Sequence, residues 1–83
     1  MKVNVRFFSS LREQLGFSVY VHETGSETVS QLRSELMVLN PLFAEVLAHG
    51  KAIRMALNQE VCQDTALLSE GCEIAFFPPV TGG

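Results

Sequence analysis

The sequence lacks the motifs that mark most catalytic and metal-binding sites. It contains only two cysteines, Cys62 and Cys72, and they lie outside any CxxC pair. Only two histidines, His22 and His49, could join them, so we expect no metal site. We interpret the cysteines as packed thiols in a reducing compartment and the histidines as surface or capping residues. No Ser-His-Asp set or glycine-rich phosphate loop occurs, so the body of the chain offers no catalytic centre.

Charged residues and long apolar runs are also scarce. Charged residues make up 18% of the chain, the net charge is −3, and lysine and arginine form no cluster, so nucleic acid is not an expected partner. No apolar run approaches the roughly 20 residues of a membrane span. The first residues already follow a strand pattern rather than that of a signal peptide. We therefore expect a cytoplasmic protein that does not bind a membrane.

The residues that are present suffice for one small globular domain. The chain has 83 residues, of which 47% are hydrophobic, and a chain of this length buries one modest core. Alternation of apolar and polar residues predicts five strands. They cover residues 2–8, 17–23, 52–57, 60–62 and 73–77.

An amphipathic helix is predicted between the second and third strands. Thr28 and Gln31 fit a capping box at its start. The helix should end just before Pro41, because proline disfavours helical geometry in the preceding residue. Its apolar stripe consists of Val29, Leu32, Leu36 and Leu39.

Two smaller helical segments complete the expected order of elements. Ser9–Gly16 is interpreted as a helical turn or a wide loop, capped by Ser9 or Ser10. Pro41–His49 is predicted to form a short helix that ends at Gly50. Strands at both ends of the chain, with one main helix between hairpins, indicate an α+β layer with a mixed sheet.

Two phenylalanines stand on the face of the sheet that should be polar. If one face packs on the helix, alternation turns Phe8 and Phe77 outward, and Val61 joins them. If the first and last strands are neighbours, these residues form an apolar patch beside the end of the chain. Exposed apolar patches mark protein contacts, so we expect a partner to dock on Phe8, Val61 and Phe77.

The chain ends in Phe76-Phe77-Pro78-Pro79-Val80-Thr81-Gly82-Gly83. The two prolines favour an extended path. The two glycines carry no Cβ, so the backbone can enter a channel too narrow for side chains. The extended reach of residues 78–83 is about 20 Å. We therefore divide the chain into a domain, residues 1–77, and a flexible tail, residues 78–83, that delivers its carboxylate into another protein's active site.

Several stretches of the chain resemble the small subunit of molybdopterin synthase. The most specific stretch is the end of the chain, since a bare Gly-Gly would equally suit ubiquitin or the sulfur carrier of the thiazole pathway. One departure is Cys72, because the family often has aspartate in this turn, and the departure leaves the tail unchanged. The matching stretches are Val5–Phe8, Leu11–Glu13, Asn58–Gln59, Leu68–Ile74 and Ala75–Gly83.

The resemblance implies a ubiquitin-like β-grasp fold, with about five strands packed on one main helix. It implies that a ubiquitin-activating-like adenylyltransferase uses ATP to adenylate Gly83, and that a sulfur donor enzyme converts Gly83 to a thiocarboxylate. In a heterotetramer with the large subunit, this sulfur would build the dithiolene of molybdopterin from a cyclic pyranopterin precursor. The chain is then a co-substrate rather than a catalyst, and it binds no cofactor stably. The inserted tail would comprise Pro78, Pro79, Val80, Thr81 and Gly82.

Two other functions remain open. A ubiquitin-like protein modifier would join Gly83 to lysines of target proteins, and a thiazole-pathway carrier would give its sulfur to a different acceptor. Both also need an adenylated Gly-Gly end, so that end does not separate them. The Phe76-Phe77-Pro78-Pro79 sequence before the end favours the molybdopterin synthase subunit.

Overall fold

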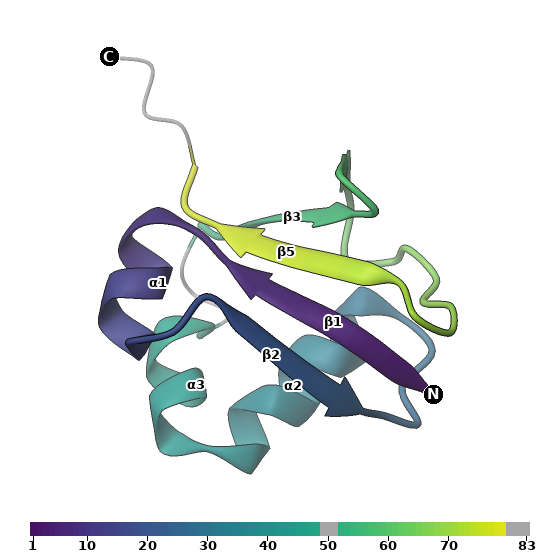
Figure 1. Cartoon of the computed structure of the whole chain (residues 1–83), viewed down its shortest axis with the longest axis horizontal. Coiled ribbons are helices and arrows are strands. Elements are labelled where there is room, and N and C mark those ends of the chain that lie inside the picture. Colours follow the sequence, from purple (N-terminus) through teal and green to yellow (C-terminus); the bar gives the residue numbers. More distant parts are fainter. Residues whose placement is uncertain (49–51, 80–83) are drawn as a thin grey trace.

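The domain is built on a single five-stranded sheet (Figure 1). The computed structural model describes residues 1–48 and 52–79, and all statements below concern these residues. Across the sheet the strand order is β2-β1-β5-β3-β4. The strands are β1 (Lys2–Phe7), β2 (Val19–Glu23), β3 (Arg54–Leu57), β4 (Glu60–Cys62) and β5 (Glu73–Phe77).

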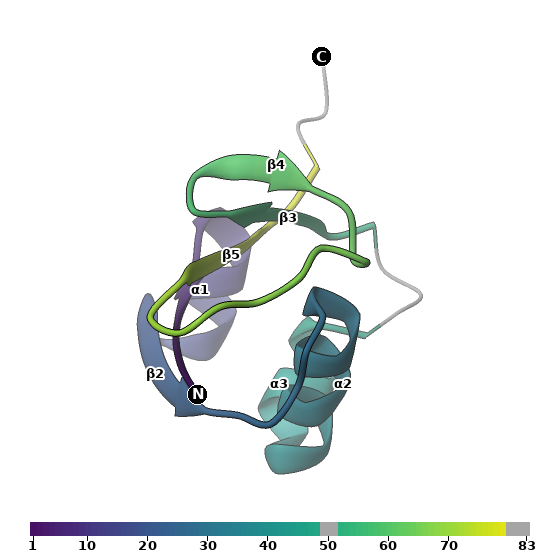
Figure 2. The same cartoon turned by 90° about the vertical axis from the view of Figure 1, so that its right-hand side faces the viewer.

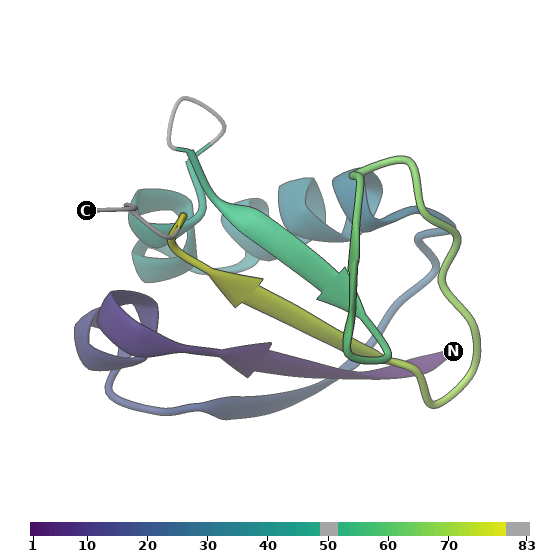
Figure 3. The same ribbon diagram turned by 90° about the horizontal axis from the view of Figure 1, so that it is seen from above.

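The first and last strands lie side by side in the middle of the sheet. β1 and β5 run parallel, with Val5 opposite Ile74 and Phe7 opposite Phe76, as Figure 3 shows from above. All other neighbouring strands are antiparallel. The predicted mixed sheet is confirmed, and so is the condition that the first and last strands are neighbours.

Helices α2 (Val29–Leu39) and α3 (Pro41–Val46) cover one face of the sheet (Figure 2). The capping box is confirmed: Thr28 Oγ1 accepts from the Gln31 amide, and Gln31 Oε1 accepts from the Thr28 amide, both at 3.2 Å. α2 ends before Pro41 as expected. α3 is shorter than predicted, and its predicted stop at Gly50 lies outside the described residues.

The segment after β1 forms a helix, α1 (Ser9–Leu15). The predicted serine cap is wrong. Phe8 occupies the N-cap position without a side-chain hydrogen bond, and Ser9 adopts a positive φ of 54°. The predicted end is right, because Gly16 adopts the left-handed conformation (φ 85°) in which its amide closes on the Arg12 carbonyl at 2.9 Å.

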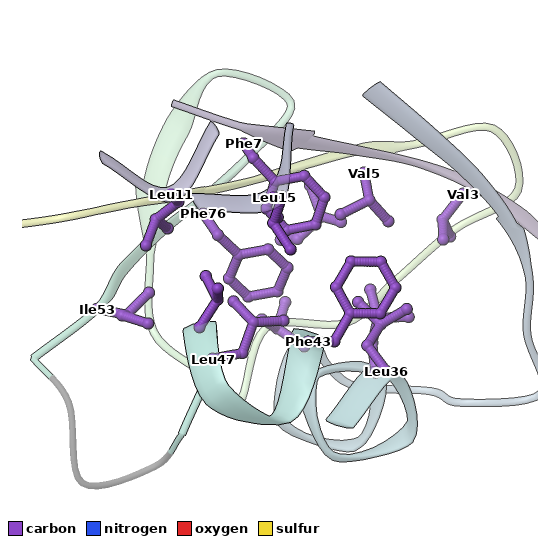
Figure 4. Packing of buried hydrophobic residues seen from close by; sticks show 14 of the residues in the cluster. Val3, Val5, Phe7, Leu11, Leu15, Leu36, Phe43, Leu47, Ile53 and Phe76 are labelled. Atoms are coloured by element: carbon purple, nitrogen blue, oxygen red, sulfur yellow. The ribbon is translucent and has the colours of Figure 1, made fainter. Parts of the chain in front are cut away.

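The core lies between the sheet and the helices (Figure 4). The ring of Phe7 stacks on the rings of Phe43 and Phe76, with centroids 5.7 and 6.0 Å apart. The predicted apolar stripe of α2 is buried except for Leu39, which is 53% exposed. Leu39 is the last residue of α2, and α3 covers the next part of the core in its place. Other buried members of the cluster are Val3, Val5, Val29, Leu32, Leu36, Val46, Leu47 and Ile74.

Strand β2 presents its polar side to the helices. His22 and Tyr20 pair with the buried Val3 and Val5 of β1, so they share the inner face. Its two valines, Val19 and Val21, are exposed on the outer face of this edge strand. Register with β1, rather than the hydrophobicity of the strand itself, therefore decides which side of β2 is buried.

Arg33 is buried although it lies off the predicted apolar stripe of α2. Its Nε donates to the Leu47 carbonyl and its Nη2 to the Ala48 carbonyl, both at 2.8 Å. These carbonyls follow the end of α3, where a helix leaves acceptors without internal partners. Burial lowers the pKa of Arg33. The guanidinium thus ties α2 to the end of α3.

Candidate functional site

The tail begins directly after the central strand β5. Pro78 and Pro79 are described, and they continue β5 at the end of the sheet where α1 lies (Figure 1). The other predicted tail residues are Val80, Thr81, Gly82 and Gly83, and they lie outside the described residues.

The two prolines line a groove of about 250 Å³ on the helix side of the sheet. The described lining residues carry no ionisable side chain, so they supply no acid or base to a reaction. The groove is mostly apolar, and it lies where the tail leaves the domain. Its other lining residues are Ser10, Leu11, Gln14, Val46, Ala52 and Ile53.

Phe8 and Phe77 lie at the same end of adjacent strands. Phe7 pairs with Phe76, and the Phe8 amide donates to the Phe76 carbonyl at 3.1 Å, which sets Phe8 beside Phe77. Phe8 is 39% exposed, and Phe77 is half-buried. The structure therefore brings together two of the three residues that were predicted to form a docking patch.

Val61 lies on the same outer face but apart from the two phenylalanines. It is 65% exposed and pairs with Ala56, which in turn pairs with Ala75 of β5. Two strand spacings, about 10 Å, separate β4 from β5. Ala56 and Ala75 lie between Val61 and the phenylalanines on this face, and both are buried, with 8% and 4% of their surface exposed. The sequence reasoning did not assign either alanine to the docking patch.

Arg6 lies beside this face and was also missed. Its Cζ lies 5.7 Å from the centre of the Phe8 ring, and its Nη1 lies 3.6 Å from Glu73 Oε1. The Arg6 Nε is buried and has no hydrogen-bond partner among the described residues. On the other side of Phe77, Arg54 of β3 is its cross-strand partner and is exposed. Two arginines therefore flank the phenylalanine pair. We use the name tail-root surface for Phe8, Phe77 and Val61 together with Arg6 and Arg54.

A second polar cluster lies away from the tail, between β2 and α2. Glu35 Oε1 lies 2.6 Å from both His22 Nε2 and the Thr24 hydroxyl that donates to it. The Ser26 hydroxyl donates to Glu35 Oε2 at 3.3 Å. These contacts, the Thr24 hydrogen bond first, lower the pKa of Glu35. His22 is therefore a partner of a carboxylate that ties strand to helix, and not only a surface or capping residue as predicted.

The two cysteines are free thiols. Cys72 is buried, and its backbone closes the turn before β5: its amide donates to the Ser69 carbonyl at 3.1 Å, and its carbonyl accepts from the Asn4 amide at 2.9 Å. Burial raises the pKa of the half-buried Cys62 thiol. Within residues 1–48 and 52–79, no group of three histidine, cysteine or acidic residues is placed to hold a metal ion. In the same part of the chain, no helix has the length and apolar character needed to cross a membrane.

The chain is similar in sequence to known proteins of about the same length. Residues 5–83 match the ThiS family. The chain is 37% identical over 81 residues to the molybdopterin synthase sulfur carrier subunit of Haemophilus influenzae, covering 98% of this chain and 99% of the relative. It is 36% identical over 81 residues to the protein of the same name from Escherichia coli, with the same coverage.

Solved structures show the same arrangement of elements. A crystal structure of SAMP1 from Haloferax volcanii superposes with a TM-score of 0.80 at 24% identity and covers all of both chains. A chain in the complex of subunits 1 and 2 of the molybdopterin-converting factor from Helicobacter pylori superposes with a TM-score of 0.70 at 27% identity, again over all of both chains. The second of these chains was solved bound to another subunit.

Proposed function

The chain belongs to the ThiS family, has its ubiquitin-like β-grasp fold and is a homologue of molybdopterin synthase sulfur carrier subunits, and on this premise we propose that it carries sulfur as a thiocarboxylate on Gly83. The observation that carries the proposal is the terminal Phe-Phe-Pro-Pro-Val-Thr-Gly-Gly sequence, which directly continues the central strand β5. No described residue of the groove beside this strand offers a competing acid or base.

Activation of Gly83 overcomes the poor leaving group of a carboxylate. One carboxylate oxygen attacks the α-phosphate of ATP, pyrophosphate leaves, and an acyl-adenylate forms. The terminal sulfur of a persulfide donor then displaces AMP, and a thiol cleaves the resulting acyl disulfide to leave the thiocarboxylate. The sulfur stays covalently attached and does not diffuse away. An adenylyltransferase and a sulfur donor enzyme supply the ATP chemistry and the persulfide, so this chain needs no resident cofactor.

The remaining tail residues bring the sulfur to the precursor. Gly82 lets the backbone approach ATP and pterin closely because it has no Cβ. Pro78 and Pro79 restrict the arm, which lowers the conformational entropy lost when it enters a channel. Val80 and Thr81 line the channel as spacers. The sulfur is transferred to the cyclic pyranopterin precursor, where two loaded copies supply the two sulfurs of the dithiolene.

The large catalytic subunit docks on Phe8, Val61 and Phe77. The Helicobacter pylori chain, which superposes over its whole length, comes from a complex of two such subunits, and this supports a partner that contributes the catalytic groups. The assembly is a heterotetramer with two carriers, located in the cytoplasm. In this assembly the chain acts as a co-substrate, and it is restored to the carboxylate after each transfer.

The intact mass of the chain tests the proposal. The purified carrier is incubated with the activating enzyme, ATP and a sulfur donor, and we expect one terminal oxygen to be replaced by sulfur. Matched controls delete Gly83 or add one residue after it, and both should stay unloaded while the domain remains folded. Loading of either control would contradict the mechanism.

Two other outcomes would assign the chain to the alternatives. Covalent attachment of Gly83 to lysines of other proteins would identify a protein modifier. Transfer of the sulfur to a thiazole precursor, with no dithiolene formed in the presence of the large subunit, would identify a thiazole-pathway carrier.

A further inference from the structure

The two ends of the sheet differ in charge. The end from which the tail leaves carries Arg6 and Arg54, and the Arg12 and Glu13 of the adjoining α1 cancel each other. The opposite end, where the N-terminus lies in Figure 1, is acidic. Its charged side chains are Lys2, Glu23, Glu60 and Glu70, whereas Glu73 lies between the two ends and pairs with Arg6 at 3.6 Å. A chain of net charge −3 therefore presents a basic pair where its tail begins.

Arg6 is held differently from the structural arginine of this domain. Arg33 is buried and donates two hydrogen bonds of 2.8 Å to carbonyls. Arg6, in contrast, has a side chain that is 43% exposed, and its contact with Glu73 is an ion pair at 3.6 Å. Exposed ion pairs of this length contribute little to stability. Arg6 thus keeps a partly exposed side chain that is not held by a structural hydrogen bond among the described residues.

The two arginines lie on opposite sides of the phenylalanine pair. Arg6 lies above the ring of Phe8, and Arg54 is the cross-strand partner of Phe77. The Arg54 side chain makes no hydrogen bond or ion pair within the described part of the chain, and the residue is exposed. An aromatic centre flanked by outward arginines matches the composition of protein contacts, in which aromatic residues and arginine are enriched.

We propose that Arg6 and Arg54 bind carboxylates that border the entrance of the channel in the large catalytic subunit. This inference rests on the proposed function, because it concerns the docking of the same tail. An apolar surface on the partner contacts Phe8 and Phe77, and acidic residues on either side of that surface pair with the two guanidinium groups. The interior of the channel has the opposite sign, since it accepts the carboxylate of Gly83.

This arrangement orients the carrier before contact. The basic end of the sheet is attracted to the acidic border, and the acidic end is repelled from it. Opposite charges on two approaching surfaces raise association rates by a factor of about 10 to 1,000 at low ionic strength. The tail then reaches its channel first, and encounters in other orientations are disfavoured.

Association kinetics with the purified large subunit test the inference. Arg54→Glu reverses one charge at the tail root, and Lys2→Glu makes the same change in net charge at the opposite end. At low ionic strength we expect Arg54→Glu to slow association about tenfold. Lys2→Glu should slow it less than about threefold, because Lys2 lies at the far end of β1 and is therefore farther from the contact than Arg54. Arg6→Gln, which avoids a second carboxylate beside Glu73, should give a smaller loss than Arg54→Glu.

The salt dependence provides a second readout. Association of the unaltered chain should slow as the ionic strength rises from about 0.01 to about 1 M, over which the Debye length falls from roughly 30 to 3 Å. An Arg6→Gln, Arg54→Gln double variant should show a flatter dependence. Thermal unfolding of each variant confirms that it is folded, and the neutral Arg54→Gln variant replaces Arg54→Glu if the latter is not.

The outcomes separate this inference from the proposed function. If the unaltered chain binds the large subunit and all variants associate at the same rate with the same salt dependence, the acidic border does not exist. If the unaltered chain neither binds the large subunit nor becomes loaded with sulfur, the proposed function itself is wrong. Slowing by Lys2→Glu as strong as that by Arg54→Glu would also overturn the inference, because the effect would then reflect net charge alone.

Discussion

At the scale of single residues, Glu35 joins helix α2 to edge strand β2. Its carboxylate accepts from the Thr24 and Ser26 hydroxyls and contacts His22. The hydrogen bonds favour the ionised form, and the pKa of Glu35 lies below its ordinary value of 4.5 as a result. The unfolded chain therefore binds this proton more readily than the folded domain does, and the stabilisation by Glu35 is present above about pH 4.5 and lost as the pH falls below it.

We predict that Glu35→Gln flattens the acid side of the stability profile. At neutral pH the variant should be less stable than the unaltered chain, because a neutral amide is a weaker acceptor than a carboxylate. The difference in free energy of unfolding should shrink between about pH 5 and about pH 3. Denaturant unfolding at several pH values measures it, with Glu45→Gln, an exposed glutamate of α3, as the control. A difference that stays constant over this range would contradict the role given to Glu35.

Residue roles of this kind were the least predictable from the sequence. Arg33 and Glu35 lie off the apolar stripe of α2, and a helix pattern alone predicts solvent for both. Their actual partners, the Leu47 carbonyl and the Thr24 hydroxyl, belong to other elements. Only the tertiary arrangement brings these groups together, so no local pattern signals the contact.

At the scale of elements, strand β5 separates the core from the docking surface by alternation. Ile74 and Phe76 are fully buried, whereas Phe77 faces outward and is half-buried. The alternation of this strand, the capping box of α2 and the end of that helix were all predicted, because each depends on residues close in sequence. The facing of β2 was not, because its register with β1 decides it.

We predict opposite effects for substitutions on the two faces of β5. Phe77→Asp should weaken binding to the large subunit at least tenfold, about 1.4 kcal/mol, because it places a charge in an apolar contact, while the domain stays folded. Ile74→Val should lower the free energy of unfolding by about 0.5–1.5 kcal/mol and leave binding unchanged. Calorimetric binding and denaturant unfolding of both variants measure this. If Phe77→Asp unfolds the domain, Phe77 belongs to the core and its assignment to the surface is wrong.

At the scale of the whole molecule, the mixed sheet and its main helix followed from the order of elements. The order of elements alone did not determine which strands pair with the first and last strands. It also did not show that Ala56, Ala75, Arg6 and Arg54 lie around Phe8 and Phe77. Cross-strand neighbours depend on the topology and register of the full sheet. The chemistry of the tail, by contrast, depends on eight consecutive residues, and the sequence carries all of them.

We predict that the domain and the tail are separable at the prolines. Deletion of residues 80–83 should change the free energy of unfolding by less than about 0.5 kcal/mol. Deletion of residues 78–83 should lower it further, by about 1 kcal/mol, because the prolines then no longer cover the groove beside Leu11 and Ile53. Unfolding by denaturant distinguishes the two deletions. Equal stability of both would show that the prolines contribute nothing to the domain.

The parallel pairing of β1 with β5 also determines when the domain can fold. β5, which lies in the middle of the sheet, is the last of the described strands along the chain, so it is synthesised after the other four. Until β5 is available, β1 is paired with β2 alone, and the hairpin of β3 and β4 has no strand that joins it to β1. Closing this contact spans most of the chain, which makes it entropically costly and slow relative to local helix formation. A chain that lacks β5 therefore cannot complete the sheet, and the parallel pair at its centre forms only when residues from both ends of the domain are present.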